Sequence, residues 1–419
     1  MLAGPIQTWI KRRIAVRQRL ERICTSYLLF LMVTTTKHSL EEAARFSGLH
    51  KSLFSHLLKS HAKVAITTLE DLSQTQARQL AKALQRVKGL PWKIVILIDS
   101  TLQHRASLHP ENAKTFNHGQ GYVIGHQWTN VVLVLGDILI PLKPIPFYSK
   151  RYCQTHDLAY QSEHERVVTY LPMLDLEDSI GAYDRREVLV LADSGYDNKK
   201  IENAIADKGW HFIIALSKTR SVKSEARDLS TPPSRQWCHI DTFFRRHRRL
   251  KWDTIRLATS GNKRKRMDLR VRHTSGYLRH VGKVELVCSE RRNRPDGRRK
   301  YLACNDLRAT ARQIVPGYRM RWAVELFHKC VKQHLGFEEG ATHGFDAVMS
   351  HVHWVYCAYI LLHMSPPGLS PGAQSIGDKQ RALQQGLADK EKRHILQKLT
   401  QIGGVQRYKD ELRQALAGT

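Results

Sequence analysis

The chain has 419 residues, of which 42% are hydrophobic and 25% are charged, and this excludes a mostly disordered protein because a core can form. No fibrous or solenoid repeat is present, so the length suits two or three ordinary domains. Lys and Arg total 67 against 38 Asp and Glu, a formal net charge of +29. Because self-repulsion of that size opposes folding, we expect a polyanionic partner. Nucleic acid is favoured over anionic lipid or a merely basic protein.

Two other classes of protein are disfavoured. The longest apolar run, residues 23–33, follows a basic segment as in a secretory signal, but it is too short to cross a bilayer. No small-residue cleavage site follows it, so we expect a buried helix and no membrane association. The seven cysteines are scattered and include no C-x-x-C pair, which argues against disulfides and structural zinc. A reducing cytoplasm fits this pattern.

Residues 1–88 are predicted to form a helical DNA-binding domain. Ser39 precedes two acidic residues, as at a helix start, and Gly48 is suited to end that helix. A second helix would complete a helix-turn-helix over about residues 39–58. Its exposed side would carry the residues able to meet a DNA major groove, namely His50, Lys51, Ser52, Ser55 and His56. A plain helical hairpin has the same spacing, so both interpretations stay open.

Strand and helix patterns alternate in residues 89–217, the predicted first part of an α/β core. We expect strands at 93–98, 127–134, 138–142, 187–192 and 211–216, helices at 163–174 and 198–208, and a loop at 102–121. The first and fourth strands are nearly continuous apolar runs, which indicates burial on both faces. Three strands followed by helix, strand, helix and strand predict an α/β fold with a mixed sheet, and this order is compatible with a ribonuclease-H-like sheet.

A basic, β-rich insertion is predicted over residues 218–306. Residues 241–300 hold twenty Lys or Arg and six Asp or Glu, a net charge of +14 and about half of the whole excess. Such density favours phosphate contact over a solvated face. Residues 307–365 would complete the core with helices at 309–335, which Pro316-Gly317 could divide, and at 347–364. A helical tail would follow over residues 366–419.

Asp99 and Asp193 share a context that suggests chemistry. Each follows directly on a buried apolar strand and precedes a serine. Neighbouring strands lie ~5 Å apart, so two such carboxylates in one sheet can approach, and they repel each other unless a cation intervenes. Hard oxygen ligands select Mg²⁺ or Mn²⁺. One aspartate at a loop start often only caps a turn, so the hypothesis rests on the pair.

A polar face on the helix at 309–335 offers a third carboxylate. Its members, at i, i+3, i+7 and i+14, are Tyr318, Arg321, Glu325 and Lys332. A glutamate there can bind a metal ion while the neighbouring cations hold phosphates. The alternative is a surface ladder in which the arginine and the glutamate form an ordinary i,i+4 pair.

The spacing Y-(2)-R-(3)-E-(6)-K, with two strand-end aspartates upstream, resembles the DDE transposases of bacterial insertion sequences. More narrowly it resembles the branch with a β-rich insertion before the catalytic glutamate, and the likeness covers about residues 90–365. It implies that Asp99, Asp193 and Glu325 are catalytic and bind two Mg²⁺ ions, for which Mn²⁺ can substitute. It also implies three contacts to the backbone of the transposon end, by Tyr318, Arg321 and Lys332.

The implied activity is binding of inverted-repeat ends, metal-dependent phosphodiester hydrolysis, and transfer of the 3′-OH ends into target DNA. Such a protein would be cytoplasmic and associated with the nucleoid. Synapsis of two ends calls for at least a dimer, and by loose analogy the tail would assist self-association. Lys218 is a further candidate phosphate contact. Trp237 and Trp252 could stack on a flipped base, although buried core tryptophans are commoner.

Two other functions also fit the sequence. One is a catalytically silent DNA-binding regulator derived from a transposase, and the other is a structure-selective ribonuclease-H-like nuclease. All three acidic residues are present, which favours an active transposase.

Overall fold

The computed structural model describes residues 5–14, 16, 18–82, 90–117, 121–225, 236–247, 250–259, 262–292, 298–340, 342–367, 369, 375–402 and 404–417. The chain divides into two compact units, which we call the helical unit and the sheet unit. The helical unit comprises Met1–Thr68, Cys330–Ala341 and Ser350–Thr419. The sheet unit comprises Leu69–Lys329 and Thr342–Met349.

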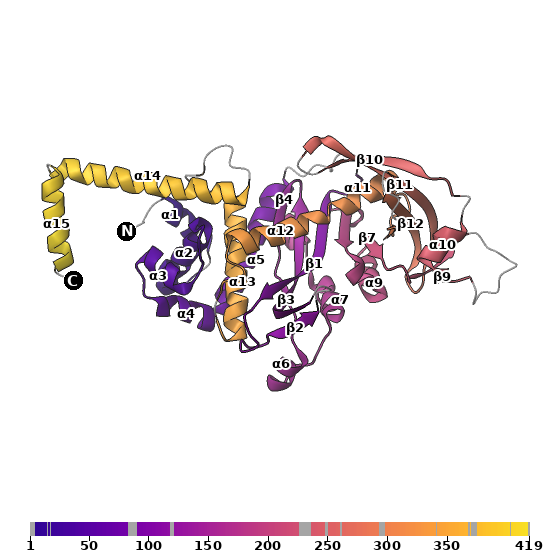
Figure 1. Cartoon of the computed structure of the whole chain (residues 1–419), viewed down its shortest axis with the longest axis horizontal. Helices are drawn as coiled ribbons and strands as arrows, with labels where there is room; N and C mark the ends of the chain where they lie inside the picture. The colour runs from indigo at the N-terminus through magenta and orange to yellow at the C-terminus, as the bar shows by residue number, and fades with distance from the viewer. Residues whose placement is uncertain are drawn as a thin grey trace. The chain divides into compact units, whose positions relative to one another are not determined.

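Thirteen strands of the described part of the sheet unit form one sheet (Figure 1). They are β1 (Ile94–His104), β2 (Lys114–Asn117), β3 (Tyr122–Leu135), β4 (Ile138–Pro141), β5 (Ile145–Pro146), β6 (Val188–Ala192), β7 (His211–Leu216), β8 (Ser221–Ser224), β9 (Cys238–His239), β10 (Asp253–Thr259), β11 (Asn262–Leu278), β12 (Gly282–Arg291) and β13 (Lys300–Cys304). Their order is β2-β3-β1-β6-β7-β13-β12-β11-β8-β9, with β4 and β5 beside β3 and β10 beside β11. β1, β6 and β7 are parallel, whereas β3 is antiparallel to β1. This mixed sheet confirms the predicted ribonuclease-H-like fold.

The helices of the sheet unit lie in the connections between these strands, except α11, which follows the last strand. They are α6 (Lys150–Thr155), α7 (Glu163–Met173), α8 (Glu177–Ile180), α9 (Lys199–Asp207), α10 (Ile240–Arg246) and α11 (Ala311–Arg319), with short 3-10 helices at Arg185–Glu187 and Ser194–Tyr196. Three further helices have residues in both units, namely α5 (Ala62–Ala81), α12 (Trp322–His334) and α13 (Phe345–His363).

The centre of the sheet forms where the sequence is continuously apolar. Every residue of β6 is buried, as is the first half of β1, which is the pattern of strands covered on both faces. Gly317 lets α11 pack closely on the sheet, because a Cβ there would lie 3.2 Å from side-chain atoms of both Ile213 and Trp92. The core of the unit therefore lies around β1, β6 and β7.

The β-rich insertion continues this sheet. β13 runs antiparallel to β7, β12 to β13, and β11 to β12. The insertion has four short β-like runs in its sequence, at 254–258, 269–273, 283–288 and 301–304. They fall within β10, β11, β12 and β13, and β11 and β12 extend well beyond them. The first part of β11 pairs with β10, and its last part continues the ladder with β12. Both parts are largely polar or charged, so an apolar pattern could not show the full strand length.

Two details of the predicted core are wrong. Residues 102–121 were expected to form a loop, yet they contain the end of β1 and all of β2. The polar end of β1 pairs with an equally polar stretch of β3, for example Gln103 with His126, so no apolar pattern marks it. Asp99 consequently lies within β1 and not after its end.

The second error is the position of the break in the helix at 309–335. The break comes at Met320 and Arg321 and not at Pro316, which α11 accommodates at the loss of one backbone hydrogen bond.

The helical unit has its own helices: α1 (Pro5–Lys11), α2 (Gln18–Val33), α3 (Leu40–Ser47), α4 (Lys51–Ser60), α14 (Ile376–Ile402) and α15 (Val405–Ala417). The apolar run at 23–33 lies in α2 and is buried nearly throughout, as predicted. Ser39 caps α3 by accepting a hydrogen bond from the Glu42 N–H at 3.2 Å, and Gly48 ends this helix at φ +67°. None of the helices in the described residues is long and apolar enough to span a bilayer.

Candidate active site

Asp99 and Asp193 lie at neighbouring positions of two adjacent parallel strands, Asp99 within β1 and Asp193 directly after β6. Ile98 of β1 is in register with Ala192 of β6, and the two aspartates are the next residues along each strand. Adjacent strands are separated by ~5 Å. The structure therefore brings together the two aspartates that the sequence singled out, although Asp99 is a strand residue and only Asp193 follows a strand end.

The carboxylate of Asp193 is held by its own loop. Asp193 is the N-cap of the 3-10 helix Ser194–Tyr196, and its Oδ1 accepts a hydrogen bond from the Gly195 N–H at 2.8 Å. An Asx turn of this kind fixes one carboxylate oxygen relative to the backbone. The orientation of Asp193 therefore depends on where this loop sits.

Glu325, on α12, is connected to Asp99 by the guanidinium of Arg321. The Nη1 of Arg321 donates to Asp99 Oδ2 at 3.2 Å, and its Nη2 donates to Glu325 Oε1. The side chains of Asp99 and Arg321 are each 14% exposed, so this ion pair is largely shielded from water. The guanidinium thus joins two of the three predicted carboxylates.

The protonation of Asp99 responds to both of the other acidic residues. Burial raises the pKa of Asp99 to about 7, while the positive charge of Arg321 opposes this shift and the negative charges of Asp193 and Glu325 add to it. Like charges disfavour ionisation when they lie close together. Asp99, Asp193 and Glu325 accordingly share one electrostatic environment.

Two further contacts place α12 and α11 over this site. Asn130, which is in register with Asp99 on β3, donates its amide hydrogen to His328 Nε2 at 2.9 Å. His328 follows Glu325 by three residues, so this contact lies about one turn further along α12. Tyr318 interacts with Arg321, and burial raises the pKa of its hydroxyl to about 12.

The chemistry of the donor set suits a divalent cation. Three carboxylates offer hard oxygen ligands of the kind that Mg²⁺ and Mn²⁺ prefer. In the described residues, however, no three acidic, His or Cys side chains converge closely enough to hold one ion together. Arg321 instead supplies positive charge between Asp99 and Glu325. Metal binding by this pair would require the guanidinium to move.

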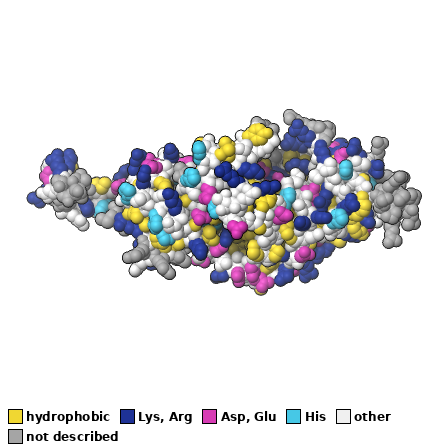
Figure 2. All heavy atoms as spheres, turned by 90° about the horizontal axis from the view of Figure 1, so that it is seen from below, with side chains coloured by type: hydrophobic (Ala, Val, Ile, Leu, Met, Phe, Trp, Pro, Cys, Tyr) yellow, Lys and Arg dark blue, Asp and Glu magenta, His cyan; other side chains and the backbone are white. Residues whose placement is uncertain are grey.

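A cationic groove lies between the insertion and α11. This cavity of about 520 Å³ has apolar side chains from Met267, Leu269, Leu302 and Val315 together with Tyr318, and it also contains Glu290, which pairs with Arg299. Its cationic side chains, with which we define the basic groove, are Lys218, Arg291, Arg298, Arg299, Lys300 and Arg319. The structure thus places Lys218 and Tyr318 in one cavity. Figure 2 shows that Lys and Arg side chains are also widely distributed over one face of the molecule, with acidic ones among them.

The two tryptophans of the insertion lie against cations. Arg272 and Arg270 stand 4.4 Å and 4.9 Å from the ring centroid of Trp252, and Lys223 stands 5.3 Å from that of Trp237. Both tryptophans are half-buried. These contacts are cation–π pairs of the insertion surface, and neither ring belongs to the buried core of the sheet.

The remaining predicted DNA contacts belong to the helical unit. Lys332, later on α12, pairs with Glu338 at 3.0 Å. Lys51, Ser52 and Ser55 line a surface cavity of about 580 Å³ along α4, and Lys51 pairs with Glu41 across it. His50 caps α4 by accepting a hydrogen bond from the Ser52 N–H. The predicted exposed side of α4 is therefore a hollowed, polar surface.

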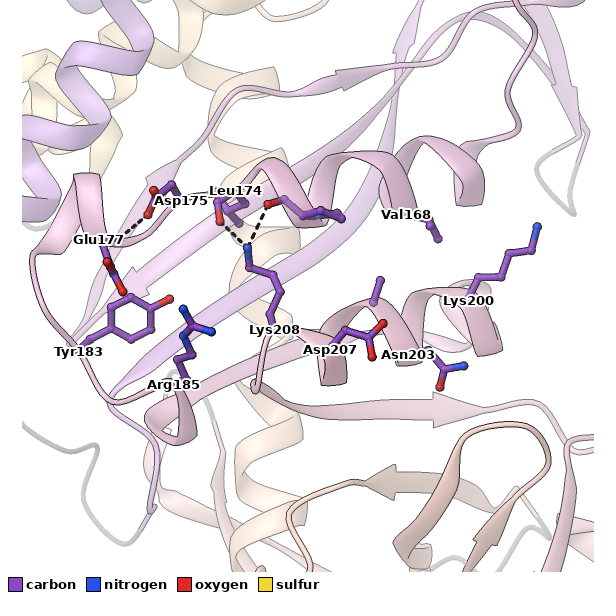
Figure 3. A pocket seen from close by; sticks show the side chains of 12 residues that line it. Val168, Leu174, Asp175, Glu177, Tyr183, Arg185, Lys200, Asn203, Asp207 and Lys208 are labelled. Atoms are coloured by element: carbon purple, nitrogen blue, oxygen red, sulfur yellow. Dashed lines mark hydrogen bonds between the residues drawn. The ribbon is translucent and has the colours of Figure 1, made fainter.

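A separate cavity of about 710 Å³ lies between α7 and α9 (Figure 3). Lys208 reaches across it and donates to the carbonyls of Pro172 and Leu174 at 3.2 Å and 2.9 Å. Its lining mixes acidic and basic side chains and contains none of the predicted catalytic residues. It therefore adds nothing to the carboxylate site.

Sequence reasoning missed a polar network beside the two aspartates. Glu163, the first residue of α7, accepts hydrogen bonds from Tyr196, Thr129 and Gln127. The available signal was the pair of polar residues at alternate positions of β3, Gln127 and Thr129, which face one side of the sheet. An acidic residue at a helix start is ordinarily explained by the helix dipole, so Glu163 did not stand out.

Carboxylates on neighbouring strands of a ribonuclease-H-like sheet, with a third on a covering helix, define a class of nucleic-acid-processing enzymes. A family model described as a transposase DDE domain matches residues 147–361, about half of the chain. The chain therefore belongs to this family and is a DDE transposase of the insertion-sequence type. Asp193 and Glu325 lie inside the matched segment, whereas Asp99 precedes it. No curated protein matches the chain.

Proposed function

We propose that this transposase binds the inverted-repeat ends of its insertion sequence, cuts the DNA by phosphodiester hydrolysis, and joins the 3′-OH ends to target DNA. The observation that carries the proposal is the arrangement of Asp99 beside Asp193, with Glu325 joined to Asp99 through Arg321. DDE transposases generally use divalent metal ions. We propose two Mg²⁺ ions here, with Mn²⁺ as a substitute.

Asp99, Asp193 and Glu325 would be the ligands. Bound divalent ions supply an activated oxygen nucleophile and stabilise the leaving oxygen in such a reaction. The buried position of Asp99 keeps bulk water away from its carboxylate, which strengthens its interaction with any cation. Arg321 would exchange its two carboxylates for a DNA phosphate, for which a guanidinium is well shaped.

The rest of the DNA path follows from the distribution of cations. Lys218 belongs to the basic groove and Tyr318 lines the same cavity, so a DNA strand lying there would be held by cations next to the helix that leads to Arg321. Lys332 would contact the same transposon end. Phosphate contacts of this kind position the DNA, while sequence is read by contacts with base edges.

The helical unit would supply recognition and assembly. We propose that residues 1–88 act as the DNA-binding domain, with Lys51, Ser52 and Ser55 of α4 meeting the major groove of the terminal repeat. Bringing two ends together requires a dimer or a larger assembly, and the tail formed by α14 and α15 is the proposed contact. Residues 89–217 and 307–365 would then form the catalytic core around the insertion at 218–306.

A nicking assay tests the proposal. The substrate is linear DNA that carries the repeats flanking the coding region, incubated with the full chain and Mg²⁺. We expect nicks at the repeat boundaries, and we expect Asp193→Ala to remove them while repeat binding is retained. Unchanged nicking by this variant would refute the catalytic role.

The same assay separates the two alternative functions. A structure-selective nuclease would cut branched DNA whether or not a terminal repeat is present. A catalytically silent regulator would bind the repeats and cut neither substrate. Strand transfer into a supercoiled plasmid would distinguish the transposase from both.

A further inference from the structure

We infer that Glu163 and His164, the first two residues of α7, are positioning residues that hold the Asp193 loop in place for catalysis. This inference rests on the proposed function, because it assigns these residues to the same carboxylate site. Neither residue is one of the three acidic residues to which the chemistry is assigned. Each acts through a hydrogen bond to the loop that follows Asp193.

Glu163 ties that loop to the strand beside β1. Its Oε1 accepts a hydrogen bond from the Tyr196 hydroxyl at 2.6 Å and another from Thr129 Oγ1 at 3.1 Å. Its Oε2 accepts from Gln127 Nε2 at 2.6 Å. Tyr196 follows Asp193 by three residues and is only 3% exposed. Thr129 lies on β3 in register with Ser100, the neighbour of Asp99. One carboxylate thus joins the loop that carries Asp193 to β3, the strand that pairs with β1 beside Asp99.

His164 holds the loop from a second direction. Its Nε2 lies 2.6 Å from the Gly195 carbonyl oxygen, so this nitrogen donates, and its Nδ1 accepts from the Asn198 side-chain amide at 3.3 Å. The N–H of the same Gly195 holds Asp193 Oδ1. A Cβ at Gly195 would lie 2.9 Å from that oxygen, so a side chain there would crowd the carboxylate. His164, Gly195 and Asp193 therefore form one continuous chain of contacts.

The packing of α7 does not need these two residues. Val167 and Leu171 are fully buried on α7, and Ser162 and Glu165 close a capping box at its start. The apolar face and the cap already hold α7 in place. The hydrogen bonds of Glu163 and His164 are therefore available to hold the Asp193 loop. Removing a direct hydrogen-bond partner of a metal ligand typically costs 10–100-fold in metal affinity or activity, and Glu163 and His164 act one contact further out, on Tyr196 and Gly195 of the loop that orients Asp193.

The test compares Glu163→Ala with Glu165→Ala in the full-length protein. Both variants remove a carboxylate from the first turn of α7, but only the first releases the Asp193 loop. We expect Glu163→Ala to raise the Mg²⁺ concentration for half-maximal nicking by about 10-fold or more, with repeat binding retained. Glu165→Ala should lower the melting temperature and leave the Mg²⁺ requirement unchanged. Equal Mg²⁺ requirements in the two variants would overturn the inference.

A paired exchange keeps the test decisive if Glu163→Ala does not fold. In Glu163→Gln the amide oxygen can still accept from Tyr196, but its NH₂ group faces the NH₂ group of Gln127. Adding Gln127→Glu lets the new amide donate to a carboxylate and restores the number of hydrogen bonds. The double variant should recover the metal requirement that Glu163→Gln loses. If the double variant needs as much Mg²⁺ as Glu163→Gln alone, the result would count against the inference.

A second readout reports metal position without nicking. With Fe²⁺, ascorbate and peroxide, backbone scission occurs next to a bound iron ion, and the fragment sizes locate it. We expect Glu163→Ala to reduce scission near Asp193 several-fold more than scission near Asp99, and an equal reduction at both would contradict a role at the Asp193 loop. If Asp193→Ala itself leaves nicking unchanged, the proposed function fails. If only Glu163→Ala behaves like its control, this inference alone fails.

Discussion

The centre of the sheet and its insertion carry opposite charge on one continuous framework. Around β1 and β6 the strands are apolar, and the polar groups are carboxylates gathered at adjacent positions. Around β11 to β13 the same sheet presents the basic groove. The sheet thereby separates two sets of charges: the cations, which attract a phosphate backbone, and the carboxylates, which suit divalent ions. This separation limits direct neutralisation of one set by the other. The separation is incomplete, because Glu290 lines the groove and pairs with Arg299. It is also incomplete because Arg321 pairs with both Asp99 and Glu325.

Removing carboxylates from the centre should have the largest effect. We expect Asp99→Asn and Glu325→Gln each to lower the nicking rate by about 100-fold or more, since metal ions contribute several kcal/mol to such reactions. DNA affinity should stay the same or rise, because negative charge is lost beside the phosphates. The measurement is single-turnover nicking together with repeat binding. Asp207→Asn, at an exposed site on α9, is the control and should retain activity.

Removing cations from the insertion should give a different and smaller effect. We expect the double variant Arg291→Ala and Lys300→Ala to bind DNA less tightly, with the slope of log affinity against log salt reduced by about one per lost phosphate contact. Nicking at saturating DNA should remain. Arg151→Ala, an exposed residue of α6, is the matched control. A slope equal to that of the control would mean that the groove is not on the DNA path.

Substitution of Arg321 tests how the cation between the carboxylates affects metal binding. Without its guanidinium, the negative potential at Asp99 and Glu325 is no longer compensated, so Arg321→Gln should bind Mn²⁺ several-fold more tightly in the absence of DNA. Nicking should fall, because a phosphate contact is lost as well. Electron paramagnetic resonance of free Mn²⁺ measures the first effect. Weaker Mn²⁺ binding by the variant would show that Arg321 supports the metal site rather than competing for it.

The smallest effect should come from the surface of α4. Lys51→Ala removes one exposed cation, so we expect a loss of DNA affinity of only a few-fold. Lys143→Ala is the matched control, because both lysines are exposed and each pairs with one glutamate. Filter binding of repeat DNA at constant salt compares the two. Identical affinities would remove Lys51 from the proposed interface.

The sequence allowed prediction of the parts of the fold in which one physical effect dominates. The buried run of β6 and the position of Asp193 after it were both predicted, because a short, continuous apolar run is typical of a strand covered on both faces. The end of β1 was not predicted. Gln103 there and its neighbour His126 on β3 are buried polar residues that form hydrogen bonds, so they give no apolar signal. Glu163 was missed because its partners lie on β3 and in the loop after Asp193, two segments that are distant from it in sequence. Arg321 was predicted beside Glu325, but its bond to Asp99 depends on the helix break after α11.

The most direct measurement of the central claim is a change of metal preference at Asp193. A cysteine thiolate is a softer ligand than a carboxylate, and it binds Mn²⁺ or Cd²⁺ in preference to Mg²⁺. We expect Asp193→Cys to bind repeat DNA, to lose nicking with Mg²⁺, and to regain part of it with Mn²⁺ or Cd²⁺. Full nicking by this variant with Mg²⁺ would show that Asp193 does not hold the metal, and the account would be contradicted.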